Sequence, residues 1–132
     1  MIKFRAWDKV DKLMTVPLDI QLGSDGYIYW IEAMGLNGEH DEGDLDVFKL
    51  EQFTGLTDVN GKEIYEDDII KSGYKYAQPK ISQVIIENGN SYILGEDLAT
   101  GNEMLVSDHI GEIKVIGNVH ENPELLEESY DN

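Results

Sequence analysis

Short runs of β-branched and aromatic residues, separated by turn-forming residues, recur along most of this chain. The clearest example joins residues 81–87 to residues 90–94 through Asn88-Gly89, the pair that most favours a two-residue hairpin turn. Asn60-Gly61 stands between two further β-capable segments and favours a second tight turn with positive φ. Further strands are expected at residues 2–7, 13–15, 20–22, 27–31, 48–53, 69–71 and 112–119. Many short strands with turns between them predict a mainly β fold, in the form of a small barrel or sandwich.

Two other segments complete the expected architecture. Residues 33–43 show no clear period and are expected to form a loop. Near the C-terminus, Asn122 suits the N-cap of a short helix, and Pro123 suits its first position. We expect a single domain over residues 1–132, with residues 1–52 as an N-terminal β-sheet portion and residues 53–127 as a small barrel followed by this helix.

The charge balance narrows the classes of partner. Asp and Glu outnumber Lys and Arg by 27 to 10 among 132 residues, which gives a formal charge of −17. Such a surface repels phosphate backbones and anionic lipid headgroups, so nucleic-acid binding is disfavoured and no membrane contact is expected. Two interpretations remain open: the charge serves solubility alone, or it offers an anionic face to a basic protein. The chain lacks cysteine, a signal peptide and a membrane-spanning run, so a cytoplasmic protein is expected.

An acidic segment at residues 39–46 is the first candidate site, because it carries five carboxylates in eight residues. Its spacing does not match the calcium loop of an EF-hand, so a solvated acidic loop is favoured over a cation site. If the segment formed a strand, Glu42, Asp44 and Asp46 would share one face as an anionic stripe. The candidate partner-binding acidic face therefore consists of Asp41, Glu42, Asp44 and Asp46.

The second candidate site is the one locally basic stretch, around residues 71–80. Lysine side chains here could contact phosphates, and tyrosine rings could stack on bases. A barrel that binds nucleic acid through this loop is therefore an alternative function, although the net charge argues against it. The candidate anion-contacting residues are Lys71, Tyr74, Lys75, Tyr76 and Lys80.

The sequence contains none of the common catalytic motifs. There is no phosphate-binding glycine loop and no G-x-S-x-G nucleophile elbow, and His40, His109 and His120 lack the spacing of metal ligands. We therefore expect no enzymatic activity, no catalytic or metal-binding residues and no cofactor. A metal-dependent hydrolase that uses the carboxylates of the acidic loop remains an alternative.

Three blocks of sequence resemble the YopX family of phage and prophage proteins. They are IKFRAWDK at residues 2–9, FTGLTDVNGKEIYEDDII at residues 53–70 and VIGNVHENPELL at residues 115–126. Two positions depart from the family pattern: Asp67 stands where glycine is usual, and His120 stands where tyrosine is common. Because Asp tolerates positive φ better than most residues, the corner at Asp67 is expected to survive the change.

The resemblance implies a mainly β fold with an SH3-like barrel, a phage or prophage origin and a homo-oligomer. It implies no activity, since the family is of unknown function, and it carries over no catalytic residues. The expected function is that of a phage or prophage accessory protein that acts in the bacterial host cytoplasm through protein–protein contacts with its acidic surface.

Overall fold

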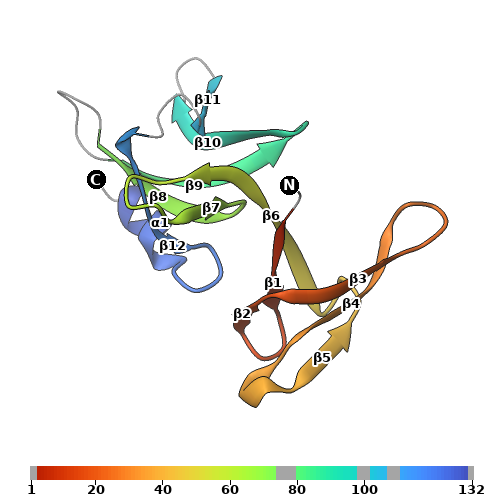
Figure 1. Cartoon of the computed structure of the whole chain (residues 1–132). Helices are drawn as coiled ribbons and strands as arrows, with labels where there is room; N and C mark the ends of the chain where they lie inside the picture. The colour runs from red at the N-terminus through yellow and green to blue at the C-terminus, as the bar shows by residue number, and fades with distance from the viewer. Residues whose placement is uncertain (1–2, 74–79, 98–101, 107–110, 131–132) are drawn as a thin grey trace. The chain divides into compact units, whose positions relative to one another are not determined.

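The computed structural model describes residues 3–73, 80–97, 102–106 and 111–130 (Figure 1). The chain divides into two compact units, here called the N-terminal unit (Ile2–Gln52) and the C-terminal unit (Phe53–Asn132). The division falls within one long strand, β6 (Phe48–Thr57), whose first half belongs to the N-terminal unit and whose second half belongs to the C-terminal unit. Each unit has a hydrophobic core of its own.

In the N-terminal unit, two antiparallel arrangements of strands enclose a small core. Strand β1 pairs with β2 on one side and with the first half of β6 on the other. Strands β3, β4 and β5 form a separate three-stranded sheet with β4 in the middle (Figure 1). The strands span Phe4–Asp8 (β1), Leu13–Thr15 (β2), Pro17–Leu22 (β3), Ile28–Met34 (β4) and His40–Gly43 (β5), and the 3-10 turn η1 spans Leu36–Gly38.

Strand β4 shows why its sheet has two different faces. Ile31 and Ala33 are fully buried and pack with Ala6 and Phe48 in the core of the N-terminal unit. Trp30, between them and the turn, is 36% exposed. Because successive side chains of a strand point to opposite faces, the even-numbered residues of this part of β4 form the outer face of the sheet.

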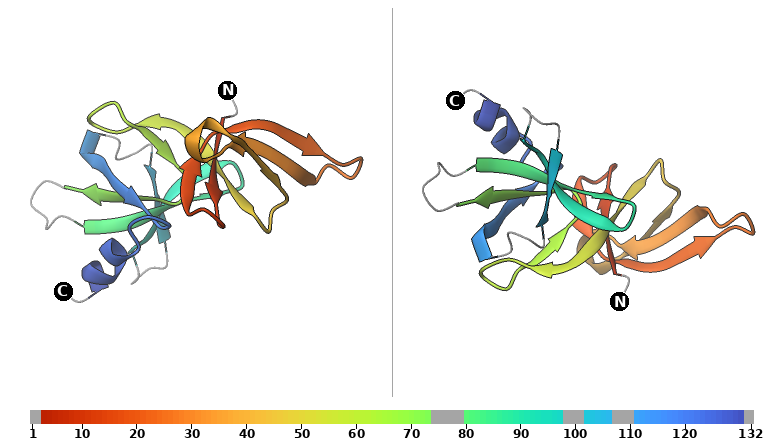
Figure 2. Two further views of the ribbon diagram at one scale, coloured as in Figure 1. Left: turned by 90° about the horizontal axis from the view of Figure 1, so that it is seen from below. Right: turned by 90° about the horizontal axis from the view of Figure 1, so that it is seen from above.

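The C-terminal unit contains an antiparallel five-stranded sheet in the order β11-β10-β9-β8-β12, which curls into a half-barrel (Figure 2). The second half of β6 pairs with β7, and α1 packs beside β9. Buried branched residues such as Ile70, Val84 and Ile113 form the core. The elements span Glu63–Tyr65 (β7), Asp68–Ser72 (β8), Lys80–Glu87 (β9), Asn90–Asp97 (β10), Asn102–Leu105 (β11), Ile113–Asn118 (β12) and Glu124–Tyr130 (α1).

The prediction of a mainly β fold with a short C-terminal helix is confirmed. The hairpin between β9 and β10 turns at Asn88-Gly89, and both turn residues have positive φ, 51° and 84°. These are the dihedrals that a type I′ turn requires. The finer assignment of the barrel as SH3-like stays a prediction.

The prediction of a loop at residues 33–43 was wrong. Strand β4 continues to Met34, and His40–Gly43 forms the edge strand β5, paired with β4 residue by residue. The edge strand is short and polar, so no alternation of apolar residues marks it in the sequence. Its structure comes from pairing with a buried neighbour rather than from its own propensity.

Asp58 fastens the turn between β6 and β7 to strand β12. One carboxylate oxygen, Oδ1, accepts hydrogen bonds from the N–H groups of Asn60 (2.8 Å) and Lys62 (2.9 Å). The other oxygen, Oδ2, accepts from the buried N–H of Val115 at 2.9 Å. Burial alone would raise the pKa of Asp58, but these three backbone donors, together with the Lys62 charge, hold that pKa below its usual value. Asp58, in the block at residues 53–70, therefore has a structural role.

The entry to helix α1 is also tied to strand β12. Asn118 Oδ1 accepts from the N–H groups of His120 and Glu121, both at 3.0 Å. The side-chain oxygen of Asn122 accepts from the Asn118 N–H at 3.3 Å, so Asn122 connects the start of the helix to β12. Its role as the N-cap stays a prediction. A Cβ at Gly117 would lie 2.5 Å from Asn122 Oδ1, so glycine leaves room for the Asn122 side chain to approach β12.

Candidate functional site

The outer face of the sheet β3–β4–β5 brings three carboxylates into one row. The strand register places Asp19 of β3 opposite Glu32 of β4, and Glu32 opposite Glu42 of β5. Glu32 lies on the same face of β4 as the exposed Trp30, since both are even-numbered in the regular part of that strand. Within the described part of the chain, no Lys or Arg forms an ion pair with any of the three carboxylates.

Aromatic and apolar side chains surround this row. Trp30 lies opposite Gln21 in the register, and the hydroxyl of Tyr29 donates to Gln21 Oε1 at 3.1 Å. Tyr29 is 55% exposed. On the other side of the row, His40 lies opposite Met34 and its Nδ1 is 2.7 Å from Glu32 Oε1. We call this surface the outer face, defined by Asp19, Gln21, Trp30, Glu32, Met34, His40 and Glu42. Tyr29 is unpaired at the register shift before Trp30, and its hydroxyl contact with Gln21 places it at the border of this face.

The structure separates the four acidic residues that the sequence grouped as one face. Asp41 and Glu42 are neighbours in β5 and therefore point to opposite sides of the sheet. Asp44 and Asp46 lie beyond the end of β5, in a turn closed by the Asp46 N–H, which donates to Asp44 Oδ1 at 2.9 Å. The stripe expected if Glu42, Asp44 and Asp46 shared a strand does not form. Of the four, only Glu42 belongs to the outer face.

The sequence does not single out Asp19 and Glu32, because only the pairing of strands β3, β4 and β5 brings them into a row with Glu42. Strand β3 has register shifts between Pro17 and Asp19 and between Gln21 and Leu22. Such shifts cannot be counted from the sequence, and a slip by one residue would move every side chain to the other face.

Asp41 instead joins a second group of carboxylates with Asp8 and Asp11. One carboxylate oxygen from each of the three lies within 4.8 Å of the other two. Asp8 is 2% exposed, and its Oδ1 accepts from the N–H groups of Val10 and Asp11 at 2.9 and 3.0 Å. Three carboxylates at such distances repel one another unless a proton or a cation lies among them. Burial, followed by the charges of Asp11 and Asp8, raises the pKa of Asp41.

Replacing Asp41 by asparagine is therefore expected to stabilise the protein at neutral pH. Because its pKa is raised in the folded state, Asp41 contributes stability that is fully present below its ordinary pKa of 3.8 and lost as the pH rises through the raised value. D41N removes the repelling charge, so its advantage over the wild type should shrink in acid. Urea unfolding across this pH range measures the effect. A D41N protein that is less stable than wild type at neutral pH would contradict it.

The candidate anion-contacting loop is only partly described. Lys71 is the penultimate residue of β8, Lys80 begins β9, and both side chains are exposed. The register pairs Lys71 with Ile81 and Ser72 with Lys80, so the two lysines lie on adjacent strands. Tyr74, Lys75 and Tyr76 lie outside the described residues.

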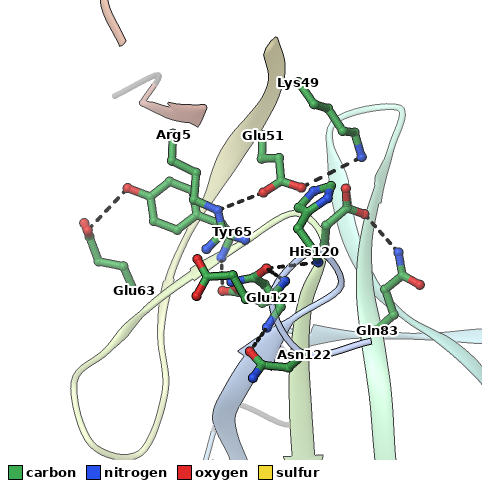
Figure 3. Close-up of polar contacts among 12 residues, drawn as sticks. Arg5, Lys49, Glu51, Glu63, Tyr65, Gln83, His120, Glu121 and Asn122 are labelled. Atoms are coloured by element: carbon green, nitrogen blue, oxygen red, sulfur yellow. Dashed lines mark hydrogen bonds and ion pairs between the residues drawn. The ribbon is translucent and has the colours of Figure 1, made fainter. Parts of the chain in front are cut away.

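Two buried carboxylates, those of Glu51 and Asp67, accept hydrogen bonds from other side chains. Arg5 Nε donates to Glu51 Oε1 at 2.9 Å, and Glu51 is fully buried (Figure 3). Gln83 Nε2 donates to Asp67 Oδ1 at 2.9 Å (Figure 3). Asp67 has φ of 68°, so the positive φ expected where the family pattern usually has glycine is present. The Gln83 contact holds the aspartate side chain in this corner.

Comparisons with known proteins give one matching family model and two similar solved structures. The family model described as YopX protein matches residues 3–127. The crystal structure of protein EF1440 from Enterococcus faecalis has a TM-score of 0.67 and 28% identity, covering 96% of this chain and 98% of that one. The crystal structure of protein yopX from Bacillus subtilis has a TM-score of 0.64 and 22% identity, covering 93% and 94%.

No functionally curated protein matches the chain. Among the residues that the structure describes, no helix has the length and apolar character needed to cross a membrane. The match of the family model extends over most of the sequence and includes all three blocks that carried the resemblance, apart from the first residue of the first block. The chain belongs to the YopX protein family.

Proposed function

We propose that this protein is a non-enzymatic binding protein that holds a basic segment of another protein on its outer face. The observation that carries the proposal is the row of Asp19, Glu32 and Glu42 across three strands, beside the exposed Trp30. In keeping with the expectations for its family, the protein acts as a phage or prophage accessory protein in the bacterial host cytoplasm, as a homo-oligomer.

Like charges directly opposite one another destabilise a sheet. The row brings two such pairs together, Asp19 with Glu32 and Glu32 with Glu42, and only His40 lies against it at ion-pair distance in the described part of the chain. A cationic partner removes the repulsion when it binds. The like-charge pairs therefore lower the stability of the free protein, and a bound cationic partner restores it. Functional sites often lower stability in this way.

The apolar surroundings favour a protein partner over a small cation. Trp30 and Met34 are each 36% exposed on the same face as Glu32, and Tyr29 borders them. Lys and Arg side chains combine an aliphatic stem with a cationic head, and such a head is attracted to both carboxylates and aromatic faces. A polyanion such as DNA has neither an aliphatic stem nor a cationic head, and the net charge of −17 repels it.

The triple variant D19N/E32Q/E42Q separates this proposal from a merely structural role. It should bind a fluorescent oligo-arginine peptide about tenfold more weakly than wild type, because the row supplies the local attraction. The same variant should be more stable than wild type by about 0.5–1 kcal/mol, since both like-charge pairs are gone. Fluorescence anisotropy measures binding, and thermal unfolding measures stability.

The control is the triple variant E87Q/E121Q/E127Q, which removes the same number of exposed charges from the C-terminal unit. If general attraction to an acidic protein explained the binding, both variants would weaken it equally, and the proposal would be wrong. A larger loss in D19N/E32Q/E42Q alone supports it. The wild type can then serve as bait in bacterial lysate, with D19N/E32Q/E42Q as the negative bait that identifies a specific partner.

The alternatives drawn from the sequence receive less support. For nucleic-acid binding, the described cations among the candidate residues are Lys71, one residue before the end of β8, and Lys80, the first residue of β9. For a metal-dependent hydrolase, the carboxylates of Asp44 and Asp46 lie in a turn away from Asp41. Absence of a mobility shift with DNA and RNA at low salt, and absence of heat on calcium, magnesium or manganese titration, are the expected results.

A further inference from the structure

A shallow depression, largely open to solvent, lies at the end of the sheet where β4 begins, and its lining residues are Ile28, Tyr29, Asp44, Leu45 and Asp46. We call it the Tyr29 hollow. It lies wholly within the N-terminal unit and borders the outer face through Tyr29. Its lining combines an aromatic ring, two aliphatic side chains and two carboxylates.

Both carboxylates at this hollow have oxygen atoms that accept no hydrogen bond from the described residues. The Asp46 side chain has no hydrogen-bond or ion-pair partner among the described residues. Asp44 uses one oxygen, Oδ1, for the Asp46 N–H, and its Oδ2 has no partner among the residues that the structure describes. On the same turn, the Lys9 ammonium donates to the Leu45 carbonyl oxygen at 2.9 Å, which holds the backbone of the turn in place. The turn is thus anchored at its tip while its carboxylates remain available.

The aromatic side of the hollow is also held in position. The Tyr29 hydroxyl donates to Gln21 Oε1 at 3.1 Å, so the ring is fixed at both ends, by its backbone in β4 and by its hydroxyl. The ring is nonetheless 55% exposed, and the neighbouring Leu45 is 46% exposed. An exposed ring with a fixed orientation beside free carboxylates provides the two attractions that cations find in proteins.

From this arrangement we propose that the Tyr29 hollow is a socket for a single arginine side chain of the partner. A guanidinium group is planar, stacks on aromatic rings and donates through a rigid fork that matches carboxylates. The apolar contribution of Ile28 and Leu45 suits the aliphatic stem of that side chain. The inference rests on the proposed function, in which a basic protein segment binds the adjoining outer face, and it names the side chain that fixes the position of that segment.

The test uses the isotope-labelled full chain titrated with N-acetyl-arginine-methylamide and observed by NMR. The amide signals of Tyr29, Asp44, Leu45 and Asp46 are expected to shift on addition. The lysine analogue should shift them less, because an ammonium cannot form the fork. The citrulline analogue has nearly the shape of arginine without its charge, and it should leave them in place. Equal shifts with citrulline or with lysine would overturn the arginine assignment.

Two variants locate the binding. D44N/D46N keeps an oxygen for the turn but removes both charges, and Y29L removes the ring. D44N/D46N is expected to lower the affinity for the arginine analogue about tenfold, with a smaller loss for Y29L. D46N alone serves as a second test, since Asp46 makes no side-chain bond that folding requires among the described residues. The control E87Q/E121Q removes two exposed charges from the other unit and should change nothing.

The results distinguish this inference from the proposed function. If D44N/D46N binds the arginine analogue as well as wild type does, the socket is wrong, whatever D19N/E32Q/E42Q does to the oligo-arginine peptide. If D19N/E32Q/E42Q also leaves peptide binding unchanged, the proposed function fails with it. Loss of arginine-analogue binding in D44N/D46N and D46N, with full binding in E87Q/E121Q, supports the socket.

Discussion

Replacing Asp58 by alanine is expected to lower the free energy of unfolding by about 4 kcal/mol, because three backbone N–H groups lose an ionised acceptor at once. One of them, the N–H of Val115, is buried, and Asp58 itself is 6% exposed. The N–H groups of Asn60 and Lys62 lie in the turn, where hydrogen bonds to water replace part of the lost hydrogen-bond energy. Urea unfolding followed by circular dichroism measures the change.

The asparagine variant refines this prediction. D58N keeps one acceptor oxygen but turns the other side of the group into a donor, so it should lose about half as much as D58A. Asp25 offers a matched control, since its carboxylate accepts one exposed N–H, that of Tyr27, at 3.0 Å. D25A is expected to lose less than about 1 kcal/mol. Equal losses for D58A and D25A would show that the link to β12 is unimportant.

The pH dependence gives an independent check on Asp58. Its pKa is lowered in the folded state, so its contribution to stability is present above the ordinary value of 3.8 and is lost as the pH falls through the lowered value. D58N has no carboxylate to protonate. The difference in unfolding free energy between wild type and D58N should therefore shrink in strong acid. A difference that stays constant down to the lowest pH would contradict the assigned role of the charge.

Replacing Arg5 by methionine is expected to lower the free energy of unfolding by about 3 kcal/mol, because it removes a cation from beside a buried carboxylate. Glu51 is fully buried, and the Arg5 side chain is 15% exposed. Lys49 Nζ lies farther away, 3.8 Å from Glu51 Oε2, and its side chain is 42% exposed. It therefore cannot compensate fully for the lost guanidinium.

The double variant R5M/E51L supplies the control for this prediction. Removing both charges leaves no uncompensated ion, and replacement of a buried pair by apolar residues is often neutral. R5M/E51L should therefore be more stable than R5M. Trp7 lies in β1 beside Arg5, so tryptophan fluorescence during urea unfolding reports on this unit. The effect of E51L on the free energy of unfolding is measured in the wild type and in R5M. If E51L lowered it by the same amount in both, the two side chains would not be coupled.

Local chemistry made much of the fold predictable. The turn at Asn88-Gly89 follows from the positive φ that these two residues tolerate, and Gly61 likewise has φ of 81° in the turn after β6. The edge strand His40–Gly43 could not be predicted, because its pairing with β4 comes from the tertiary structure. For the same reason the side chain of Asn122 bonds back to Asn118 in a way that its position before Pro123 does not reveal.

The candidate site was less predictable than the fold. Closeness in sequence grouped Asp41 with Glu42, but alternation along a strand sends them to opposite faces. Asp19 and Glu32 are far from the acidic segment in the sequence, and only the register, with its two shifts in β3, brings them into a row with Glu42. A charged row across a sheet can be recognised only once the pairing of the strands is known.

Mapping the binding surface by NMR shows whether the outer face binds a basic segment. The isotope-labelled full chain is titrated with the oligo-arginine peptide at moderate salt, and the amide signals are followed by NMR. If the outer face binds the peptide, the largest shifts are expected in β3, β4 and β5, with Asp19, Glu32 and Glu42 among them. The largest shifts in the acidic C-terminal segment around Glu121, Glu124 and Glu127, or shifts spread evenly over both units, would contradict it.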